Sequence, residues 1–224
     1  MASNRVSIPP PAFSCQTSIW AIVPVKPLLE SKRRLAHILS AEARGDLIHR
    51  FLAHTLTVLN ESGVIDRVLV VSSDERVLAT AQSHGAELLV ETAVLGLNPA
   101  VTHAAQFAAD KGATAVLILP ADLPFIEKQD VAIMVKEKRS RPHIVICSDD
   151  QGTGTNALFL SPPHNFTFRY GSGSFQQHLQ EAIQRGQTVH IIQNRTNLQF
   201  DLDTEEDWQK YQLTMANYQL SIDN

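Results

Sequence analysis

Short apolar runs alternate with longer amphipathic stretches along nearly the whole chain. The runs have the length of strands and are rich in Ile, Val and Leu; they cover residues 19–25, 68–71, 88–90, 115–119, 144–147 and 189–192. Runs that stay apolar without alternating are typical of strands that are covered on both faces. The pattern therefore predicts one mostly parallel sheet with helices on either side.

Signals for helices lie between these runs. Ser40 and Asp74 each precede apolar positions at helical spacing and predict N-caps. Asn98 before Pro99 predicts another N-cap, with proline at the first helical position. Further helices are expected over 130–135, over 174–183 and after Thr204. The succession predicts a single-domain, three-layer α/β/α fold that is doubly wound and Rossmann-like.

The ends of the chain and its composition set the domain limits. We expect residues 1–18, which include Pro9-Pro10-Pro11, to be a flexible tail, 19–214 to be the domain and 215–224 to be a C-terminal tail. The chain has 224 residues, of which 44% are hydrophobic and 19% charged. This composition is typical of a globular protein and not of a disordered one.

Charge and cysteine content exclude several classes of protein. A net charge of −4 provides no basic field for nucleic acid or an anionic membrane surface. No apolar run reaches the ~18 residues of a membrane span, so no membrane association is expected. Cys15 and Cys147 have neither zinc nor CxxC spacing, and we expect two reduced thiols in a cytoplasmic protein.

A cluster of cations follows the first predicted strand. The segment from Lys26 to Arg34 carries four cations, the others being Lys32 and Arg33. In an α/β sheet, ligands bind beyond the carboxyl ends of the strands, and such donors suit a polyphosphate there. A solvated basic loop is the alternative. The chain contains neither a Walker A sequence nor GxGxxG, which argues against a P-loop enzyme or an ordinary dinucleotide fold.

Three carboxylates are candidates for binding Mg²⁺. Asp122 lies between Pro120 and Pro124 after a buried run, on a stiff loop, and its alternative role is to cap a turn. Asp201 and Asp203 are two residues apart and would face the same side of a strand. If they meet Asp122, a metal site lies beside the cationic loop, which suits nucleotidyl transfer. Otherwise one Asp caps a turn and the other is solvated.

Two loops rich in small residues complete the candidates. Residues 152–156 form the first, and residues 171–174 form the second, which leads directly into a predicted helix. A glycine-rich turn that opens a helix offers backbone N–H groups to an anion, although an ordinary helix start has the same spacing. The nine histidines show no metal-ligand spacing and are interpreted as surface or core side chains.

Taken in order, these segments resemble one family. The matching pieces are VPVKPLLESKRRLA, VVSSD, GLNPAV, LPADLP, GTGTNAL, YGSGSFQQH and DLDTEED, spread over residues 22–207. They resemble the guanylyltransferases of coenzyme F-420 biosynthesis, a branch of the nucleotidyltransferases related to the molybdenum-cofactor guanylyltransferase. The resemblance implies the nucleotide-diphospho-sugar transferase fold and a GTP-dependent reaction, in which GMP moves to a three-carbon phospho-acid and pyrophosphate leaves.

The resemblance also implies roles for individual residues. The catalytic and phosphate-binding residues would be Lys26, Lys32, Arg34 and Asp122. Further contacts to the nucleotide would come from Ser73, Gly96 and Asn98. The acceptor would be held by Thr155, Gly171 and Ser174. The metal carboxylates would be Asp122, Asp201 and Asp203. Arg33, where the family leads us to expect a small residue, and the N-terminal extension are departures from the family pattern.

The acceptor and two rival functions remain to be separated. Archaeal members use 2-phospho-L-lactate and bacterial ones phosphoenolpyruvate; the composition favours phosphoenolpyruvate and hence enolpyruvyl-2-diphospho-5'-guanosine as product. A glycosyltransferase of related fold would typically show Asp-x-Asp after a middle strand, where this chain has only Asp122. A non-catalytic nucleotide-binding domain would be expected to lose the cations or an Asp. A homodimer and a hand-off of the labile product to the next enzyme are further expectations that no residue carries.

Overall fold

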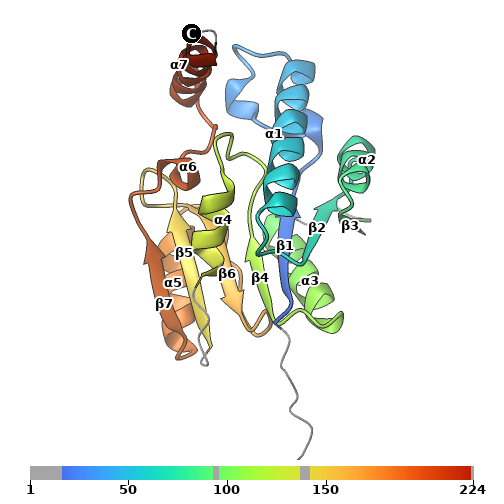
Figure 1. The fold of residues 1–224 in the computed structure, drawn as a ribbon, viewed down its shortest axis with the longest axis vertical. Coiled ribbons are helices and arrows are strands. Elements are labelled where there is room, and N and C mark those ends of the chain that lie inside the picture. The colour runs from blue at the N-terminus through green and yellow to red at the C-terminus, as the bar shows by residue number, and fades with distance from the viewer. Residues whose placement is uncertain (1–16, 93–95, 137–141, 223–224) are drawn as a thin grey trace, which may run out of the picture.

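A single seven-stranded sheet forms the centre of the protein (Figure 1). The computed structural model describes residues 17–92, 96–136 and 142–222. The strand order is β3-β2-β1-β4-β6-β5-β7, and β6 alone runs antiparallel to its neighbours. The strands are β1 Ile19–Pro24, β2 Arg67–Ser72, β3 Glu87–Val90, β4 Ala115–Ile118, β5 His143–Ser148, β6 Thr155–Ser161 and β7 Thr188–Ile192. The expected mostly parallel α/β fold is confirmed.

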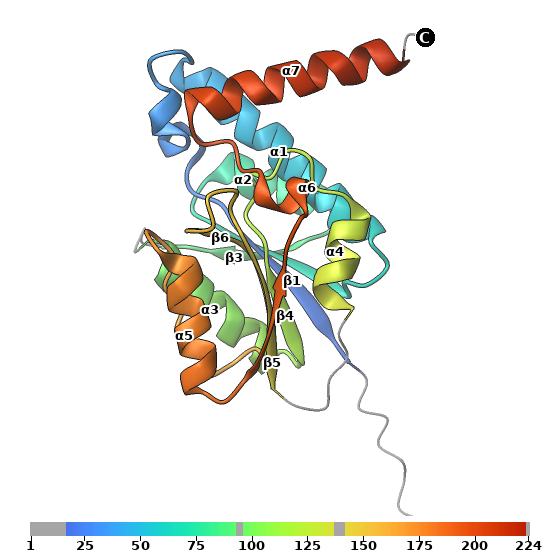
Figure 2. The same cartoon turned by 90° about the vertical axis from the view of Figure 1, so that its left-hand side faces the viewer.

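Helices cover both faces of this sheet. The α-helices are α1 Ala41–Glu61, α2 Glu75–Ser83, α3 Leu97–Asp110, α4 Lys128–Val135, α5 Ser174–Gln184, α6 Thr196–Gln199 and α7 Glu205–Ile222. Two short 3-10 helices, η1 Leu28–Glu30 and η2 Arg33–Leu35, lie in the loop after β1. Figure 2 shows α3 and α5 on one side of the sheet and α1 and α4 on the other. None of the described helices combines the length and apolar character that a membrane crossing needs.

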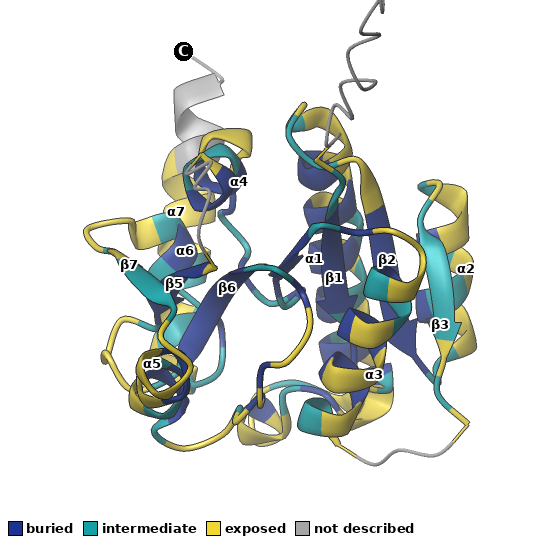
Figure 3. Cartoon of the chain, turned by 90° about the horizontal axis from the view of Figure 1, so that it is seen from below, coloured by how far each residue is buried: buried dark blue, intermediate teal, exposed yellow. Residues whose placement is uncertain are grey.

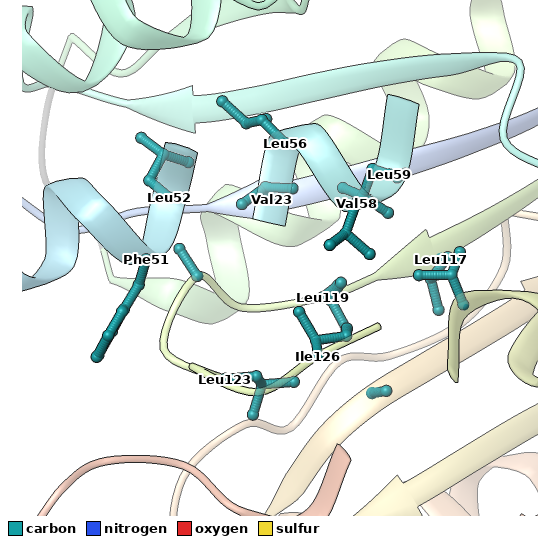
Figure 4. Close-up of a cluster of buried hydrophobic side chains, with 14 of the residues drawn as sticks. Val23, Phe51, Leu52, Leu56, Val58, Leu59, Leu117, Leu119, Leu123 and Ile126 are labelled. Atoms are coloured by element: carbon teal, nitrogen blue, oxygen red, sulfur yellow. The ribbon is translucent and has the colours of Figure 1, made fainter. Parts of the chain in front are cut away.

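Each face of the sheet has its own apolar core. On the α1 side, Leu52, Leu56 and Leu59 recur at helical spacing and pack with Val23 of β1 and Leu117 of β4 (Figure 4). On the α3 side, the core contains Trp20, Leu158 and Phe175, among others. In Figure 3 the central strands are buried, whereas the edge strands β3 and β7 are only half-buried. Burial on both faces explains why the central strands are apolar without alternation.

The strand β6 is missing from the set that the apolar runs predict. Its first two residues, Thr155 and Asn156, were assigned to a loop of small residues, and the prediction stops there. The strand then continues through residues 157–160, which are all buried. It follows β5 through a turn, which is the short connection that antiparallel strands allow. The antiparallel member of the sheet is therefore the one that the sequence pattern did not reveal.

Two of the three predicted N-caps are confirmed. The side chain of Ser40 accepts a hydrogen bond from the N–H of Ala43, and that of Asp74 accepts from two N–H groups of α2. The predicted N-cap at Asn98 is wrong: α3 begins at Leu97, and Gly96 is its N-cap residue. A proline within the first turn is compatible with this start, because the N–H groups there have no partner within the helix.

The C-terminal helix extends past the boundary that the sequence led us to expect. The helix α7 continues to Ile222, so the expected boundary at 214 falls inside a helix. The projecting end of this helix is visible in Figure 2. Most of the expected N-terminal tail, with Cys15, lies outside the described residues. Cys147 is buried within β5 as a free thiol, and burial raises its pKa to about 12.

Candidate functional site

A cavity of about 440 Å³ opens at the carboxyl ends of β1 and β4. This is the point where the chain passes from one side of β1 to the other in the sheet order, which is the usual ligand position in doubly wound folds. Its wall includes the loop after β1, the start of α3, the segment after β4 and part of the segment after α6. Among the predicted residues, the wall contains Lys26, Lys32, Arg34, Gly96, Asp122 and Asp203.

Three carboxylates meet at the edge of this cavity. One oxygen each from Asp122, Asp201 and Asp203 lies within 4.8 Å of the others. The convergence was predicted, but the expectation that Asp201 and Asp203 lie in a strand is wrong, because residues 200–203 form an irregular segment after α6. The buried Leu202 anchors this segment, and its N–H donates to the backbone oxygen of Asp122 at 3.3 Å. An oxygen-only donor set of this kind suits a hard divalent cation.

The ammonium group of Lys32 connects two of these carboxylates. Its Nζ lies 2.7 Å from Oδ2 of Asp122 and 2.6 Å from Oδ1 of Asp203. The side chain of Lys32 is only 5% exposed. Burial lowers the pKa of Lys32, but the two carboxylates outweigh burial and raise this pKa above its usual range. The backbone of Lys32 has a φ of 51°, which is uncommon for a residue with a side chain.

Asp201 and Asp203 have pKa values that are shifted in opposite directions. Burial raises the pKa of Asp201 to about 6, with a further contribution from the charge of Asp122. A hydrogen bond from Asn156 to Asp201 acts in the opposite direction. Burial also raises the pKa of Asp203, but Lys32 outweighs burial, so this pKa is lowered overall. Asp203 therefore stays ionised beside Lys32, whereas Asp201 titrates closer to neutrality.

An irregularity in β6 directs two adjacent side chains toward different partners. Cys147 pairs with Ala157, whereas the next residue of β5, Ser148, pairs with Thr155, so Asn156 is an extra residue in its strand. Such bulges change the direction of side chains. The amide Nδ2 of Asn156 donates to Asp201 and to the backbone oxygen of Gln199, at 3.1 and 3.0 Å.

Thr155 belongs instead to a buried cluster with Ser174 and His178. Nδ1 of His178 lies 3.0 Å from Oγ1 of Thr155, and the backbone N–H of Arg169 donates to Nε2 of His178. Because Nε2 accepts a hydrogen bond, the proton of the neutral ring is on Nδ1 and is donated to Thr155. The hydroxyl of Ser174 also donates to Thr155, at 3.3 Å. Thr155 therefore keeps its own hydroxyl proton for another acceptor. Burial lowers the pKa of His178 to about 4, so this ring is neutral at pH 7.

The turn that leads into α5 is held by Asn98. Its Oδ1 accepts from the N–H of Tyr170 at 2.6 Å, and its Nδ2 donates to the oxygen of Tyr170 at 3.1 Å. Gly171 follows with a φ of 124°, a conformation that strains any residue with a side chain. The side chain of Asn98 thus bonds the turn before α5. Asn98 and Ser73 are not among the described residues that line the cavity.

The structure places most of the predicted site residues in two groups, and Ser73 in neither of them. Thr155, Gly171 and Ser174 lie around the start of α5 and are not part of the described cavity wall. Sequence reasoning missed two residues, Asn156 and His178. His178 follows Ser174 by four residues, a helical spacing that places both on one face of α5 and that was a usable signal. Asn156 gave no comparable signal, because its contact with Asp201 depends on a bulge.

Solved structures of known proteins share this fold. A nucleotidyl transferase from Methanothermobacter thermautotrophicus superposes with a TM-score of 0.64 and 13% sequence identity, over 90% of this chain and 99% of that one. At this identity the likeness shows the fold, which is that of the nucleotidyltransferases. The chain also matches a family model described as guanylyl transferase CofC like over residues 19–216, and it belongs to that family.

Named relatives of the chain are guanylyltransferases. A phosphoenolpyruvate guanylyltransferase of Rubrobacter xylanophilus is 43% identical over 190 residues, covering 85% of this chain and 91% of the relative. A 2-phospho-L-lactate guanylyltransferase of Methanothermobacter thermautotrophicus is 37% identical over 187 residues, covering 84% and 81%. The expected family, fold and enzyme class are confirmed.

Proposed function

We propose that the protein transfers GMP from GTP to the phosphate of phosphoenolpyruvate, with release of pyrophosphate. The product is enolpyruvyl-2-diphospho-5'-guanosine, and the reaction takes place in the cytoplasm. The observation that carries the proposal is the cavity wall that combines Lys26, Lys32 and Arg34 with the carboxylates of Asp122 and Asp203. The 43% identity to a phosphoenolpyruvate guanylyltransferase supports this acceptor. The relative that is named for 2-phospho-L-lactate keeps that acid as the second candidate acceptor.

The carboxylates fit a magnesium ion. The donor set of Asp122, Asp201 and Asp203 contains only carboxylate oxygens, and the ammonium group of Lys32 shows that two of them hold a cation. When bound there, Mg²⁺ would neutralise charge on the triphosphate oxygens. Asn156 would orient Asp201 through the hydrogen bond to its carboxylate, a support that ligating carboxylates generally have.

The cations of the loop provide the remaining charge stabilisation. Lys26 and Arg34 line the cavity and interact electrostatically with Asp203. From this position they would bind the triphosphate and stabilise the pyrophosphate as it leaves. The phosphate of the acceptor is already ionised, so the reaction needs no general base to create a nucleophile. Catalysis would then consist of positioning and charge neutralisation, and positioning alone can contribute roughly 7–11 kcal/mol at best.

The cluster at the start of α5 would hold the acceptor. Thr155 retains a hydroxyl proton because His178 and Ser174 both donate to its oxygen. A fixed hydroxyl donor beside a glycine-rich helix start suits a carboxylate or phosphate oxygen. We assign Thr155, Gly171 and Ser174 to the phospho-acid on this basis.

The test is to incubate the protein with GTP and Mg²⁺ and to measure pyrophosphate release with each acceptor separately. We expect release with phosphoenolpyruvate, and little with 2-phospho-L-lactate or with GTP alone. Release only with 2-phospho-L-lactate would change the acceptor and leave the reaction type intact. ATP in place of GTP is the control for base selectivity. Absence of release with both acids, together with glycosyl transfer from a nucleotide sugar, would contradict the proposal.

A further inference from the structure

Lys32 is paired with the same carboxylates to which the proposed function assigns the metal. We propose that Lys32 is an exchangeable internal cation: it holds Asp122 and Asp203 until a divalent metal binds them, and it then turns to the phosphates of the nucleotide. The inference rests on the proposed function only in the assignment of a metal to these carboxylates. The inference concerns which anion the ammonium group of Lys32 pairs with before and after a metal binds.

The distances indicate that Lys32 and a bound metal would compete for these carboxylate oxygens. The nitrogen of Lys32 lies 2.7 Å from an oxygen of Asp122 and 2.6 Å from an oxygen of Asp203. Mg²⁺ binds carboxylate oxygens at about 2.0–2.1 Å. An ion that bridged the same two oxygens would lie within contact distance of the ammonium nitrogen. Two positive charges at that separation repel strongly in a partly buried site, so the ammonium group and the metal would compete for these oxygens.

The burial of Lys32, Asp122 and Asp203 indicates from which side a metal ion can reach the carboxylates. Lys32 is 5% exposed, whereas Asp122 and Asp203 are 29% and 45% exposed. The ammonium group therefore approaches the carboxylates from the protein side, while their free faces are open to solvent. All three residues also line the cavity. A metal ion can thus reach the carboxylates from solvent, and the released ammonium group stays at the cavity wall.

The other cations of the loop do not have this arrangement. Among the described residues, the ion pairs of Asp122 and Asp203 are made by Lys32, while Lys26, Arg33 and Arg34 line the cavity without such a pair. Arg33 is the neighbour of Lys32 and carries the same charge, but it forms no ion pair with these carboxylates. Arg33 therefore separates the effect of the ion pair from the effect of net charge.

The exchange would couple the binding of metal and nucleotide. In the metal-free protein the charge of Lys32 is neutralised by two carboxylates and is not available to a phosphate. Once a metal replaces it, the same charge faces the cavity and can bind an anion. We therefore expect the divalent metal to strengthen nucleotide binding through Lys32 in addition to its own contact with the phosphates.

The first test is Mn²⁺ binding to the nucleotide-free protein, measured by electron paramagnetic resonance. If Lys32 competes with the metal, Lys32→Met should bind Mn²⁺ at least tenfold more tightly than the wild type, because the competing cation is gone. Arg33→Met, which removes one charge from the same loop, should stay within about threefold of the wild type. Thermal unfolding of each variant verifies that it is folded.

The sign of the change decides between exchange and mere support. If Lys32 only keeps the carboxylates together, Lys32→Met binds Mn²⁺ more weakly than the wild type, and the exchange is wrong. An affinity equal to that of Arg33→Met also contradicts it. If neither the wild type nor Lys32→Met binds Mn²⁺ at millimolar concentration, the metal role in the proposed function fails together with the exchange. Binding without tightening overturns the exchange alone.

The second test needs no variant. An amine-reactive reagent is applied to the wild-type protein, and the labelling of Lys32 is measured by mass spectrometry. We expect Mg²⁺ to increase this labelling severalfold and a non-hydrolysable GTP analogue to reduce it again. The exposed Lys128 serves as the internal control, with unchanged labelling. If the labelling of Lys32 does not rise with Mg²⁺, the exchange is wrong. If the labelling rises but the GTP analogue does not reduce it, Lys32 does not contact the phosphates after the exchange.

Discussion

The cluster of carboxylates around Lys32 and the hydroxyl cluster around His178 are held together by different interactions, the first by ion pairs and the second by hydrogen bonds between neutral groups. The first consists of charges from residues up to 171 positions apart in the sequence, and its carboxylates are partly exposed. The second consists of neutral groups on β6 and α5, and it is buried. The charged group can bind a ligand by exchanging ions, whereas the neutral cluster depends on where each proton is fixed.

This difference predicts different responses to mutation. Removing a charge from the first group changes the electrostatic energy of the reacting phosphates, so it should change turnover. Removing a hydroxyl from the second changes one hydrogen bond, so it should change the affinity for one substrate. The four predictions below are ordered by the size of the expected effect.

Asp122→Asn should lower turnover by more than about 100-fold, because an electrostatic partner of the transition state contributes about 2.7–4 kcal/mol. Steady-state pyrophosphate release at saturating GTP, acceptor and Mg²⁺ measures the effect. Asp110→Asn, at the exposed end of α3, is the matched control and should keep normal turnover. Near-normal turnover of Asp122→Asn at saturating Mg²⁺ would end the metal assignment.

The pH dependence of stability should reveal the neutral His178. Its pKa is about 4 in the folded protein and near 6.5 when unfolded, so the unfolded chain binds more protons between these values. The free energy of unfolding should therefore fall by up to about 3 kcal/mol as the pH drops from 6.5 to 4. Urea unfolding of the wild type and of His178→Gln across this range isolates the contribution. Parallel curves for the two proteins would mean that His178 is not held neutral.

Asn156→Ala should raise the Mg²⁺ concentration at half-maximal rate by about tenfold. The variant loses the hydrogen bond that holds Asp201, and losing such a partner of a metal ligand typically costs 10–100-fold in affinity or activity. Titration of the rate with Mg²⁺ measures it. Asn197→Ala is the control, since Asn197 bonds a carboxylate outside this group, that of Asp130. An unchanged Mg²⁺ requirement would separate Asp201 from the metal site.

Ser174→Ala should raise the acceptor KM by about fivefold, which corresponds to one hydrogen bond of about 1 kcal/mol. The affinity for GTP should change little, because Ser174 contacts Thr155 and does not line the described cavity wall. Ser172→Ala, on the exposed part of the same turn, is the control. If the GTP affinity falls instead, the two substrate sites have been assigned the wrong way round.

The sequence predicted the charged group better than the neutral one, for a physical reason. Charged residues after apolar runs are visible in a sequence, and the parallel sheet brings the ends of β1 and β4 together, so Lys32 and Asp122 were predictable neighbours. Their direct ion pair was not predicted, because no pattern in the sequence indicates the direction of the Lys32 side chain, whose backbone has a left-handed φ of 51°. The role of Asn156 was missed, because it follows from an antiparallel strand and its extra residue. His178 was missed although its helical spacing from Ser174 was visible in the sequence.

The extra residue in β6 also limits how the chain length can vary. The side chain of Thr155 bonds within the buried hydroxyl cluster, and that of Asn156 bonds Asp201. The directions of both side chains depend on the one-residue offset in the pairing of β6 with β5. A deletion of one residue here would restore regular pairing and turn at least one of these side chains away from its partner. Substitutions can adjust either region separately, but insertions and deletions at this position alter both together. In a library of length variants, this short segment should therefore tolerate no indels.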